Sequence, residues 1–231
     1  MRTNPLIVAL DTGHQETVRA LVQDLAPLVG AFKVGYFPFL RFGWELVEFI
    51  HSRGGRVFLD LKFHDIPNTV ANAVEEAAPK KVFMVTLHTL GGREMLRAAW
   101  ERIRDVSPRP LLLGVTILTH MTPETLAEAG IQGPLPQRVL TLATLAREGH
   151  LDGVVASPSE ARSIREGLGK GFIIVTPGVR PMGAETQDQK RATTPREALA
   201  AGAHYVVVGR PIYQAPDPIE AAQRILEELK T

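Results

Sequence analysis

The chain has 231 residues, of which 45% are hydrophobic, and its 26 lysine and arginine residues nearly balance 25 aspartate and glutamate residues, which leaves a formal net charge of +1. This balance gives no broad positive surface for DNA, RNA or an anionic membrane, so we expect no nucleic-acid or membrane partner and expect any anionic ligand to be bound by a local cluster of cations. The chain has no cysteine, which excludes disulfides, thiolate metal ligands and a cysteine nucleophile, and it shows no signal peptide and no apolar run near the roughly 18 residues of a membrane span, so we expect a cytoplasmic protein.

Short apolar runs rich in β-branched residues alternate with helical patterns along the chain. The eight runs lie at residues 5–10, 31–35, 56–61, 81–87, 110–118, 152–157, 171–176 and 204–209. Apolar residues spaced three and four apart predict helices between them, at residues 17–29, 39–54, 69–78, 94–105 and 136–149. Apolar strands that alternate with helices are typical of a parallel sheet covered on both faces or of a closed barrel. Eight repeats without a Pro-, Gly- or Ser-rich linker favour a single α/β domain, a (β/α)8 TIM barrel over residues 1–231.

Polar residues follow most of the predicted strands. They are Asp11, Lys33, Asp60, Lys62, His88, Thr119, Ser157, Gly209 and Arg210. A strand often becomes polar simply where it leaves the core, so no single residue of this set indicates a site. In a (β/α)8 barrel, however, all of these exits meet at the carboxyl ends of the strands, where such enzymes carry their active sites.

The segment VFLDLKFHDIPNT, residues 57–69, ends an apolar strand in opposite charges. Alternation along the strand puts Asp60 and Lys62 on the same face. Two like charges about 4 Å apart repel by roughly 4 kcal/mol at an effective dielectric near 20, so each carboxylate should face a lysine. We therefore predict an array of alternating charge: Lys33, Asp60, Lys62 and Asp65. Such an array can hold a charged lysine for catalysis or can be a salt-bridged surface rim, and the spacing alone leaves both open.

The run YVVVGRPIYQ, residues 205–214, indicates an anion site after the eighth strand. Gly209 allows backbone N–H groups to approach an oxyanion, and Arg210 offers a planar fork that matches phosphate oxygens. Pro211 fits the first position of a helix, whose free N–H groups attract anions. Because (β/α)8 enzymes commonly bind phosphate after strands seven and eight, we predict a phosphate site here.

A long loop follows the seventh strand. Residues 176–195, TPGVRPMGAETQDQKRATTP, show no helical or strand period over about twenty residues, which is longer than most ordered connections. Loops of this length are usually lids or disordered insertions. As a lid, the loop would bring Arg180 and Gln189 to a phosphate when it closes, whereas Lys190 and Arg191 could equally be solvated charges.

Over essentially its full length the chain resembles the orotidine 5'-phosphate decarboxylase family. The resemblance rests on LIVALD, FKVG, FLDLKFHDIPNTV, LHTLGG, GVTILT, TPGVRP with Gln189 downstream, and VVVGRPI. The DLKFHDIPNTV segment and the spaced lid motif are highly specific together. The resemblance implies conversion of orotidine 5'-phosphate to uridine 5'-phosphate and carbon dioxide, the last step of de novo pyrimidine synthesis, with no metal and no organic cofactor.

The resemblance also implies a role for each site residue. Lys62 would be the general acid that protonates C6, held in place by Asp60 and Asp65. In the family Asp65 and Thr69 reach across an interface, which implies a homodimer in which they complete the partner's site. The implied substrate-binding residues are Lys33 and Asp11 at the ribose, Thr119 at the pyrimidine edge, and Arg180, Gln189, Gly209 and Arg210 at the phosphate.

Two rival functions remain open. A metal-dependent sugar-phosphate decarboxylase or synthase of the same suprafamily shares the D-x-K-x-x-D motif, but those relatives use a glutamate where this chain has Lys33, to help bind magnesium. A noncatalytic nucleotide-binding barrel would bind the nucleotide without turnover. With Lys62 as the proton donor, we expect structural or hydrogen-bonding roles for His64 and His88. We expect Ser157 to cap the helix that follows it.

Overall fold

The computed structural model describes residues 4–181 and 193–230, in which eight parallel strands form a closed barrel. Strands that follow one another in sequence pair side by side, and β8 pairs with β1 to close the ring. The predicted (β/α)8 TIM barrel is therefore confirmed. The strands are β1 (Leu6–Ala9), β2 (Ala31–Gly35), β3 (Val57–Phe63), β4 (Met84–His88), β5 (Leu111–Val115), β6 (Gly153–Val155), β7 (Ile173–Pro177) and β8 (Tyr205–Val208).

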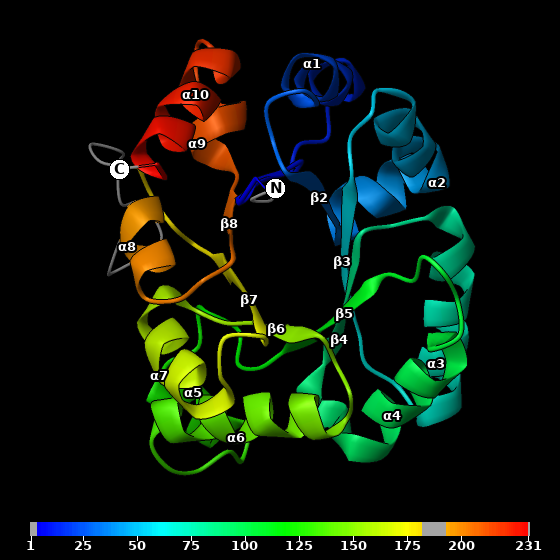
Figure 1. Ribbon diagram of the computed structural model, residues 1–231, viewed down its shortest axis with the longest axis vertical. Coiled ribbons are helices and arrows are strands. Elements are labelled where there is room, and N and C mark those ends of the chain that lie inside the picture. Colours follow the sequence, from blue (N-terminus) through cyan, green and yellow to red (C-terminus); the bar gives the residue numbers. More distant parts are fainter. Residues whose placement is uncertain (1–3, 182–192, 231) are drawn as a thin grey trace.

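Helices surround the strands and cover the outer face of the barrel (Figure 1). All five helices predicted from apolar spacing are present, with bounds that differ by a few residues. The α-helices are α1 (Gln15–Leu25), α2 (Tyr36–Ser52), α3 (Pro67–Ala77), α4 (Gly92–Ile103), α5 (Pro123–Glu128), α6 (Leu135–Glu148), α7 (Pro158–Leu168), α8 (Pro195–Ala200), α9 (Arg210–Tyr213) and α10 (Pro218–Glu228). Two 3-10 turns, η1 (Ala78–Lys80) and η2 (Thr89–Gly91), complete the described elements.

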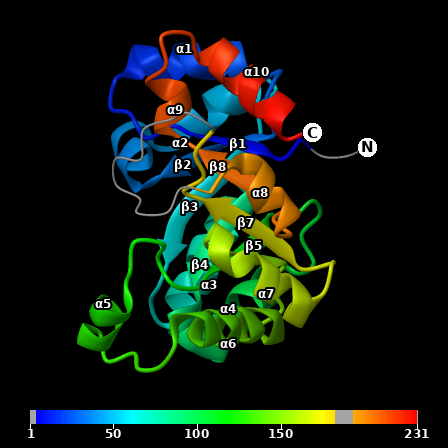
Figure 2. The same ribbon diagram turned by 90° about the vertical axis from the view of Figure 1, so that its left-hand side faces the viewer.

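Strand β5 is shorter than the apolar run 110–118 that predicted it, because it ends at Val115. Its pairing with both neighbouring strands ends at this residue. The last pair with β4 is His88 with Val115, and the last pair with β6 is Val115 with Val155. The chain then leaves the barrel toward α5, which stands out from the body on the side away from the chain termini (Figure 2). Thr119 lies in this connection.

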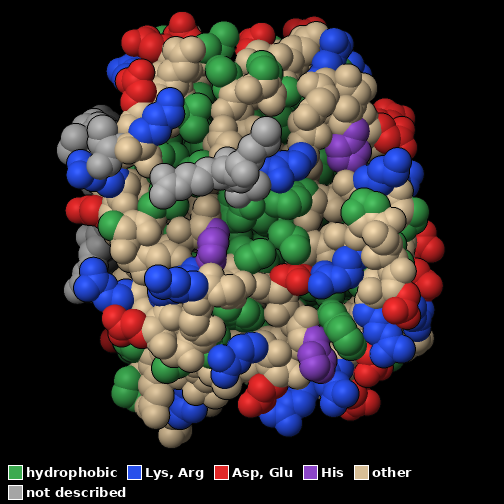
Figure 3. All heavy atoms as spheres, viewed as in Figure 1, with side chains coloured by type: hydrophobic (Ala, Val, Ile, Leu, Met, Phe, Trp, Pro, Cys, Tyr) green, Lys and Arg blue, Asp and Glu red, His purple; other side chains and the backbone are tan. Residues whose placement is uncertain are grey.

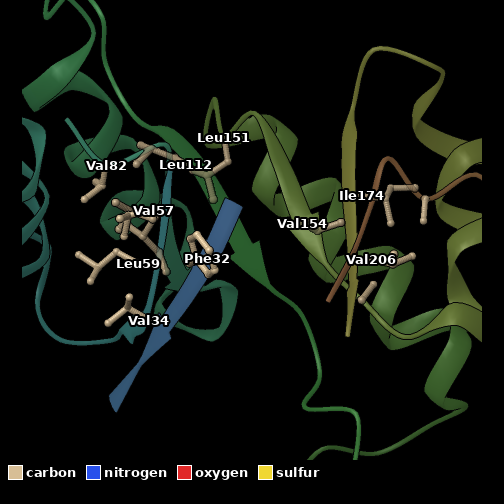
Figure 4. Close-up of a cluster of buried hydrophobic side chains, with 14 of the residues drawn as sticks. Phe32, Val34, Val57, Leu59, Val82, Leu112, Leu151, Val154, Ile174 and Val206 are labelled. Carbon is tan, nitrogen blue, oxygen red and sulfur yellow. The ribbon is translucent and has the colours of Figure 1, made fainter. Parts of the chain in front are cut away.

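Buried apolar side chains fill two regions. One lies between the strands and the surrounding helices, where Phe32, Leu59, Leu112 and Ile174 are fully buried (Figure 4). The other fills the interior of the barrel and comprises Ile7, Ala9, Ala31, Phe58, Met84, Leu113, Val175, Tyr205 and Val207. Alternation along each strand divides its side chains between these two regions.

The same alternation decides which side chains reach the carboxyl end of the barrel interior. On β3 the interior series runs from Phe58 to Asp60, and on β4 it runs from Met84 to Thr86. Both series thus change from apolar to polar toward the end of the strand. This end is where (β/α)8 enzymes build their active sites.

The face of the molecule seen in Figure 3 carries basic and acidic side chains interspersed around its rim, with apolar side chains near its centre. This mixture agrees with the balanced composition of the chain. Within residues 4–181 and 193–230, none of the helices combines the length and the apolar character needed to cross a bilayer.

Candidate active site

Charged side chains from three neighbouring strands meet at the carboxyl end of the barrel. Asp11 follows β1, Lys33 lies on β2, and Asp60 and Lys62 lie on β3. The parallel register places Gly35 of β2 opposite Asp60, so the ends of these strands lie side by side. Residues separated by up to 51 positions in the sequence are therefore brought to one place by strand pairing.

These four side chains form a line of alternating charge, which we call the charge array. Lys33 Nζ lies 3.1 Å from Asp11 Oδ1 and 3.7 Å from Asp60 Oδ2, and Lys62 Nζ lies 2.9 Å from the same Asp60 oxygen. The side chains of Lys33 and Asp60 are only 13% and 10% exposed. Each buried charge needs an opposite partner to offset its loss of hydration, and the alternation supplies one on every side.

Gly35 lies beside the ion pair of Lys33 and Asp11 in the charge array. A Cβ atom at this position would lie 3.0 Å from Lys33 Nζ and 3.4 Å from Asp11 Oδ1. The ion pair between these two side chains thus occupies the space beside a residue that has no side chain.

Lys62 lies in an irregular part of β3. The pairing of β3 with β4 is regular up to Leu59 and resumes at Phe63 with a shifted register. Lys62 itself has a φ of +46°. A non-glycine residue in this region of backbone space costs about 1 to 3 kcal/mol and persists only where its surroundings enforce it. Such strain at the residue that meets Asp60 indicates a functional position.

Asp65 does not join the charge array within one chain, in contrast to the predicted line of four. Strand β3 ends at Phe63, Asp65 lies in the turn before α3, and the ion pair of Lys62 is with Asp60. Its Oδ1 accepts a hydrogen bond from the N–H of Ile66 at 2.6 Å. Asp65 and Thr69 instead line a cavity of about 260 Å³ beside the lysine, whose full lining is Tyr36, Leu61, Lys62, Phe63, His64, Asp65, Thr69, Val70 and Ala73.

The residues predicted to bind phosphate lie after β7 and β8. We predicted Pro211 at the first position of the helix after β8. Helix α9 begins at Arg210, so Pro211 is instead its second residue. A Cβ atom on Gly209 would approach its neighbours no closer than 3.4 Å, so packing alone does not require glycine there. Arg180 follows β7, and its Nη1 donates to the carbonyl of Val179 at 3.1 Å.

Tyr213 on α9 connects the arginines to the charge array. Burial raises the pKa of the Tyr213 hydroxyl, and the negative charge of Asp11 raises it further, whereas Arg210, Lys33 and Arg180 lower it. A Cβ atom on Gly209 would lie 3.4 Å from both Ala9 of β1 and Tyr213, and β8 pairs with β1, so the start of α9 lies beside the end of β1. The predicted phosphate site and the charge array therefore belong to one region at the end of the barrel.

Of two further predicted residues, the structure describes one. Thr119 is exposed in the connection after β5. Gln189 lies outside the described residues, as do Lys190 and Arg191.

His64 and His88 stack beside Lys62, with ring centroids 5.2 Å apart. Burial lowers the pKa of His88, and the neighbouring His64 and Lys62 lower it further. Its Nδ1 atom is buried, with no hydrogen-bond partner among the described residues. As predicted, Ser157 precedes α7 as its capping residue, and its N–H donates to the carboxylate of Glu160 at 2.9 Å.

Two residues beside the charge array were not predicted from the sequence. The hydroxyl of Thr86 donates to Asp60 Oδ1 at 3.0 Å and accepts the backbone N–H of Lys62 at 2.8 Å. The ring of Tyr36 lies 5.9 Å from Lys62 Nζ, and burial followed by the charge of Asp60 raises the pKa of the Tyr36 hydroxyl. One sequence feature could have identified Thr86. It lies two residues before His88, so alternation puts both side chains on the same face of the strand.

A closed barrel that gathers paired lysines and aspartates at the carboxyl ends of its strands defines a (β/α)8-barrel enzyme. Comparison with known proteins narrows this class. A family model described as Orotidine 5'-phosphate decarboxylase / HUMPS family matches residues 4–225. The chain therefore belongs to this family.

Individual relatives agree over nearly the whole chain. An orotidine 5'-phosphate decarboxylase of Syntrophotalea carbinolica is 52% identical over 229 residues, which cover 97% of this chain and 94% of the relative. One of Moorella thermoacetica is 48% identical, with 97% and 92% covered. A crystal structure of orotidine 5'-phosphate decarboxylase from Lactobacillus acidophilus matches with a TM-score of 0.87 and 35% identity over 99% of this chain and all of that one.

The lowered pKa of His88 predicts a pH dependence of stability. Below its ordinary pKa of 6.5, the unfolded chain binds a proton at this position that the folded chain excludes, so the free energy of unfolding falls as the pH falls through this range. We expect His88→Asn to lose less stability than the wild type between about pH 7.5 and pH 5.5, measured by denaturant unfolding. Part of the loss should remain, because burial also lowers the pKa of His51 and His204.

The control for this measurement is His120→Gln, which changes an exposed histidine in the connection after β5. Its free energy of unfolding should fall by as much as that of the wild type over the same pH range. If His88→Asn and His120→Gln lose stability equally over this range, the burial of His88 does not contribute to the pH dependence.

Proposed function

We propose that the protein decarboxylates orotidine 5'-phosphate to uridine 5'-phosphate and carbon dioxide in de novo pyrimidine synthesis. The observation that carries the proposal is the charge array, in which the Lys62 ammonium meets the Asp60 carboxylate at 2.9 Å in a strained part of β3. Relatives that are about half identical over nearly the whole chain carry this activity in their names.

The reaction requires electrostatic stabilisation. When the bond between C6 and the carboxylate breaks, carbon dioxide leaves and the electron pair stays at C6 in the plane of the ring, where the π system cannot delocalise it. The ammonium of Lys62 stabilises this pair and donates a proton to it, which gives the C6–H bond of the product and a neutral amine that regains a proton from water. A fixed charge positioned before the reaction acts without the cost of reorganising solvent.

Asp60 has two functions in this proposal. It holds the Lys62 ammonium through the contact at 2.9 Å. It also sets a negative charge close to the substrate carboxylate, so that repulsion is relieved as carbon dioxide leaves. In the free enzyme Lys33 offsets the negative charge of Asp60, since Lys33 Nζ lies 3.7 Å from the Asp60 carboxylate.

The rest of the substrate would bind around the charge array. Asp11 accepts hydrogen bonds from the ribose hydroxyls, because an ionised carboxylate only accepts, and Lys33 binds beside it. Thr119 contacts the pyrimidine edge. The phosphate binds to Arg180, Gln189, Gly209 and Arg210. The pairing of β8 with β1 on one side and with β7 on the other supports one continuous site for the ribose and the phosphate.

We further propose that the active enzyme is a homodimer in which Asp65 and Thr69 complete the partner's site. Support comes from large exposed apolar side chains, three of them on α2 and one at Ile66, the residue after Asp65, because grouped apolar exposure marks interaction surfaces. Their exposed fractions are 53% for Tyr36, 52% for Phe37, 84% for Leu40 and 66% for Ile66. Tyr36, Asp65 and Thr69 line the same cavity beside Lys62.

The position of the Lys33 ammonium disfavours the rival function of a metal-dependent sugar-phosphate decarboxylase or synthase. Lys33 stands where that rival needs a carboxylate for magnesium, and its ammonium repels a metal ion. Within the described part of the chain, no group of three or more histidine, aspartate or glutamate side chains is arranged to hold a metal ion.

Activity on orotidine 5'-phosphate, followed by the loss of its absorbance, tests the reaction and the metal question together. We expect the wild type to keep its rate after exhaustive chelation. We expect Lys62→Ala to lose at least about 100-fold in kcat, because it removes the acid, while Lys80→Ala, a lysine paired with Glu48 on the surface, keeps the wild-type rate. Loss of wild-type activity on chelation, with recovery on addition of magnesium, would support the rival.

The phosphate assignment predicts a selective loss of affinity. Hydrogen bonds to charged groups contribute about 1.5 to 3 kcal/mol, so Arg210→Ala should weaken uridine 5'-phosphate binding by about 10- to 100-fold while uridine binding stays unchanged. Calorimetric titration measures both affinities. The control is Arg224→Ala on α10, an exposed arginine paired with Glu220. Equal affinity of the wild type for uridine and uridine 5'-phosphate would contradict the assignment.

A shared site predicts that two inactive chains can complement each other. In a purified hybrid of a Lys62→Ala chain with an Asp65→Ala chain, one site receives both intact residues, so we expect about half of the wild-type activity per dimer. The matched control is a hybrid of Lys62→Ala with Asp60→Ala. Because both of these residues serve their own chain's site, that hybrid should be inactive. If both hybrids are equally inactive, Asp65 does not act across the interface.

A further inference from the structure

Thr86 is a buried polar residue that makes two hydrogen bonds to the charge array. It lies on β4 with none of its surface exposed. Its Oγ1 atom lies 2.8 Å from the backbone nitrogen of Lys62 and 3.0 Å from Asp60 Oδ1. One hydroxyl therefore joins the backbone of one array residue to the side chain of the other.

The direction of both hydrogen bonds follows from the groups involved. A backbone N–H can only donate, so the Thr86 oxygen accepts from Lys62. An ionised carboxylate can only accept, so the hydroxyl hydrogen is directed to Asp60 Oδ1. The other carboxylate oxygen of Asp60 then remains for the Lys62 ammonium at 2.9 Å. The two oxygens of Asp60 thus have separate partners, which fixes the plane of the carboxylate.

The position of Thr86 in the sheet explains why a hydroxyl is needed there. Leu59 of β3 pairs with Val85 of β4, and the next pair is Phe63 with Leu87. Thr86 is the β4 residue between these pairs, so it lies opposite the irregular part of β3 that contains Lys62. The irregular register leaves the Lys62 N–H without a regular ladder partner, and the Thr86 side chain takes its place.

The backbone of Lys62 depends on this support. Its φ of +46° is a conformation that a non-glycine residue keeps only when its surroundings enforce it. The hydrogen bond from its N–H to Thr86 is one such constraint, and it lies within the same residue whose ammonium meets Asp60. Loss of the hydroxyl would free the backbone of Lys62 and the carboxylate of Asp60 together.

We propose that Thr86 is a positioning residue, whose hydroxyl holds the Asp60 carboxylate and the strained Lys62 backbone so that the ammonium is aimed at the reacting carbon. This inference rests on the proposed function for the role of Lys62. Because Thr86 is fully buried, it touches no substrate and acts through these two residues. The hydroxyl should therefore matter for kcat and not for nucleotide affinity.

The test compares Thr86→Val, which keeps the shape and removes the hydroxyl, with Thr86→Ser, which keeps the hydroxyl. A displacement of about 1 Å at a catalytic group can cost about 100-fold in rate, so we expect Thr86→Val to lose about 10- to 100-fold in kcat on orotidine 5'-phosphate. Its affinity for uridine 5'-phosphate should stay within about threefold of the wild type, and Thr86→Ser should restore most of the rate. Rates are expressed per site that binds uridine 5'-phosphate, so that partial misfolding does not imitate a loss.

The matched control is Thr176→Val. Thr176 on β7 is equally buried, and its hydroxyl has no hydrogen-bond partner among the described residues. Its replacement should leave kcat and affinity unchanged. A wild-type kcat in Thr86→Val would overturn the proposal, as would an equal loss in Thr86→Ser. A Thr86→Val chain that binds no uridine 5'-phosphate would overturn it too, since the hydroxyl would then serve folding and not positioning.

A second measurement separates this proposal from the proposed function. We expect the amide hydrogen of Lys62 to exchange with solvent at least about tenfold faster in Thr86→Val than in Thr86→Ser, because the valine offers no acceptor. This readout needs no activity. If the wild type does not turn over orotidine 5'-phosphate, the proposed function fails while amide exchange still tests the positioning. Equal exchange in the two variants would overturn the positioning by itself.

Discussion

The contact between the Asp60 carboxylate and the Lys62 ammonium is the interaction on which the rest of the site depends. Asp60 is 7% exposed, so its charge is stable there only because Lys62, Lys33 and Thr86 each provide a partner. Removal of one member would leave its neighbours charged and incompletely paired in a partly buried place, which is costly. The array is therefore a cooperative unit, in which each member offsets the lost hydration of its neighbours.

The barrel supplies this unit through strand geometry. Parallel pairing brings the ends of β1, β2 and β3 side by side, and the two-residue period directs every second side chain into the interior. The interior side chains are apolar at Phe58 and Met84. Two residues further along the same strands they are polar, at Asp60 and Thr86. The apolar layer below supports the charges, and Lys62, in the irregular part of β3, has its Nζ 2.9 Å from Asp60 Oδ2.

The sequence predicted the fold and most of the charge array for one physical reason. Periodicity identifies strands and helices, and once the barrel is assumed, Lys33 and Asp60 must lie on neighbouring strand ends. What it could not predict depends on contacts between distant residues. Thr86 resembles an ordinary β-branched strand residue, and its role arises from the irregular pairing opposite it. The closeness of Tyr213 to β1 likewise depends on the closure of the barrel by the pairing of β8 with β1.

The most direct test of the account is the exchange of the C6 hydrogen of uridine 5'-phosphate for deuterium in heavy water, followed by proton NMR. This exchange runs the final proton transfer in reverse and needs no carboxylate, so it reports on stabilisation of the carbanion alone. We expect exchange with the wild type and none above the uncatalysed rate with Lys62→Ala. Exchange at the wild-type rate in Lys62→Ala would contradict the central role of the charge array.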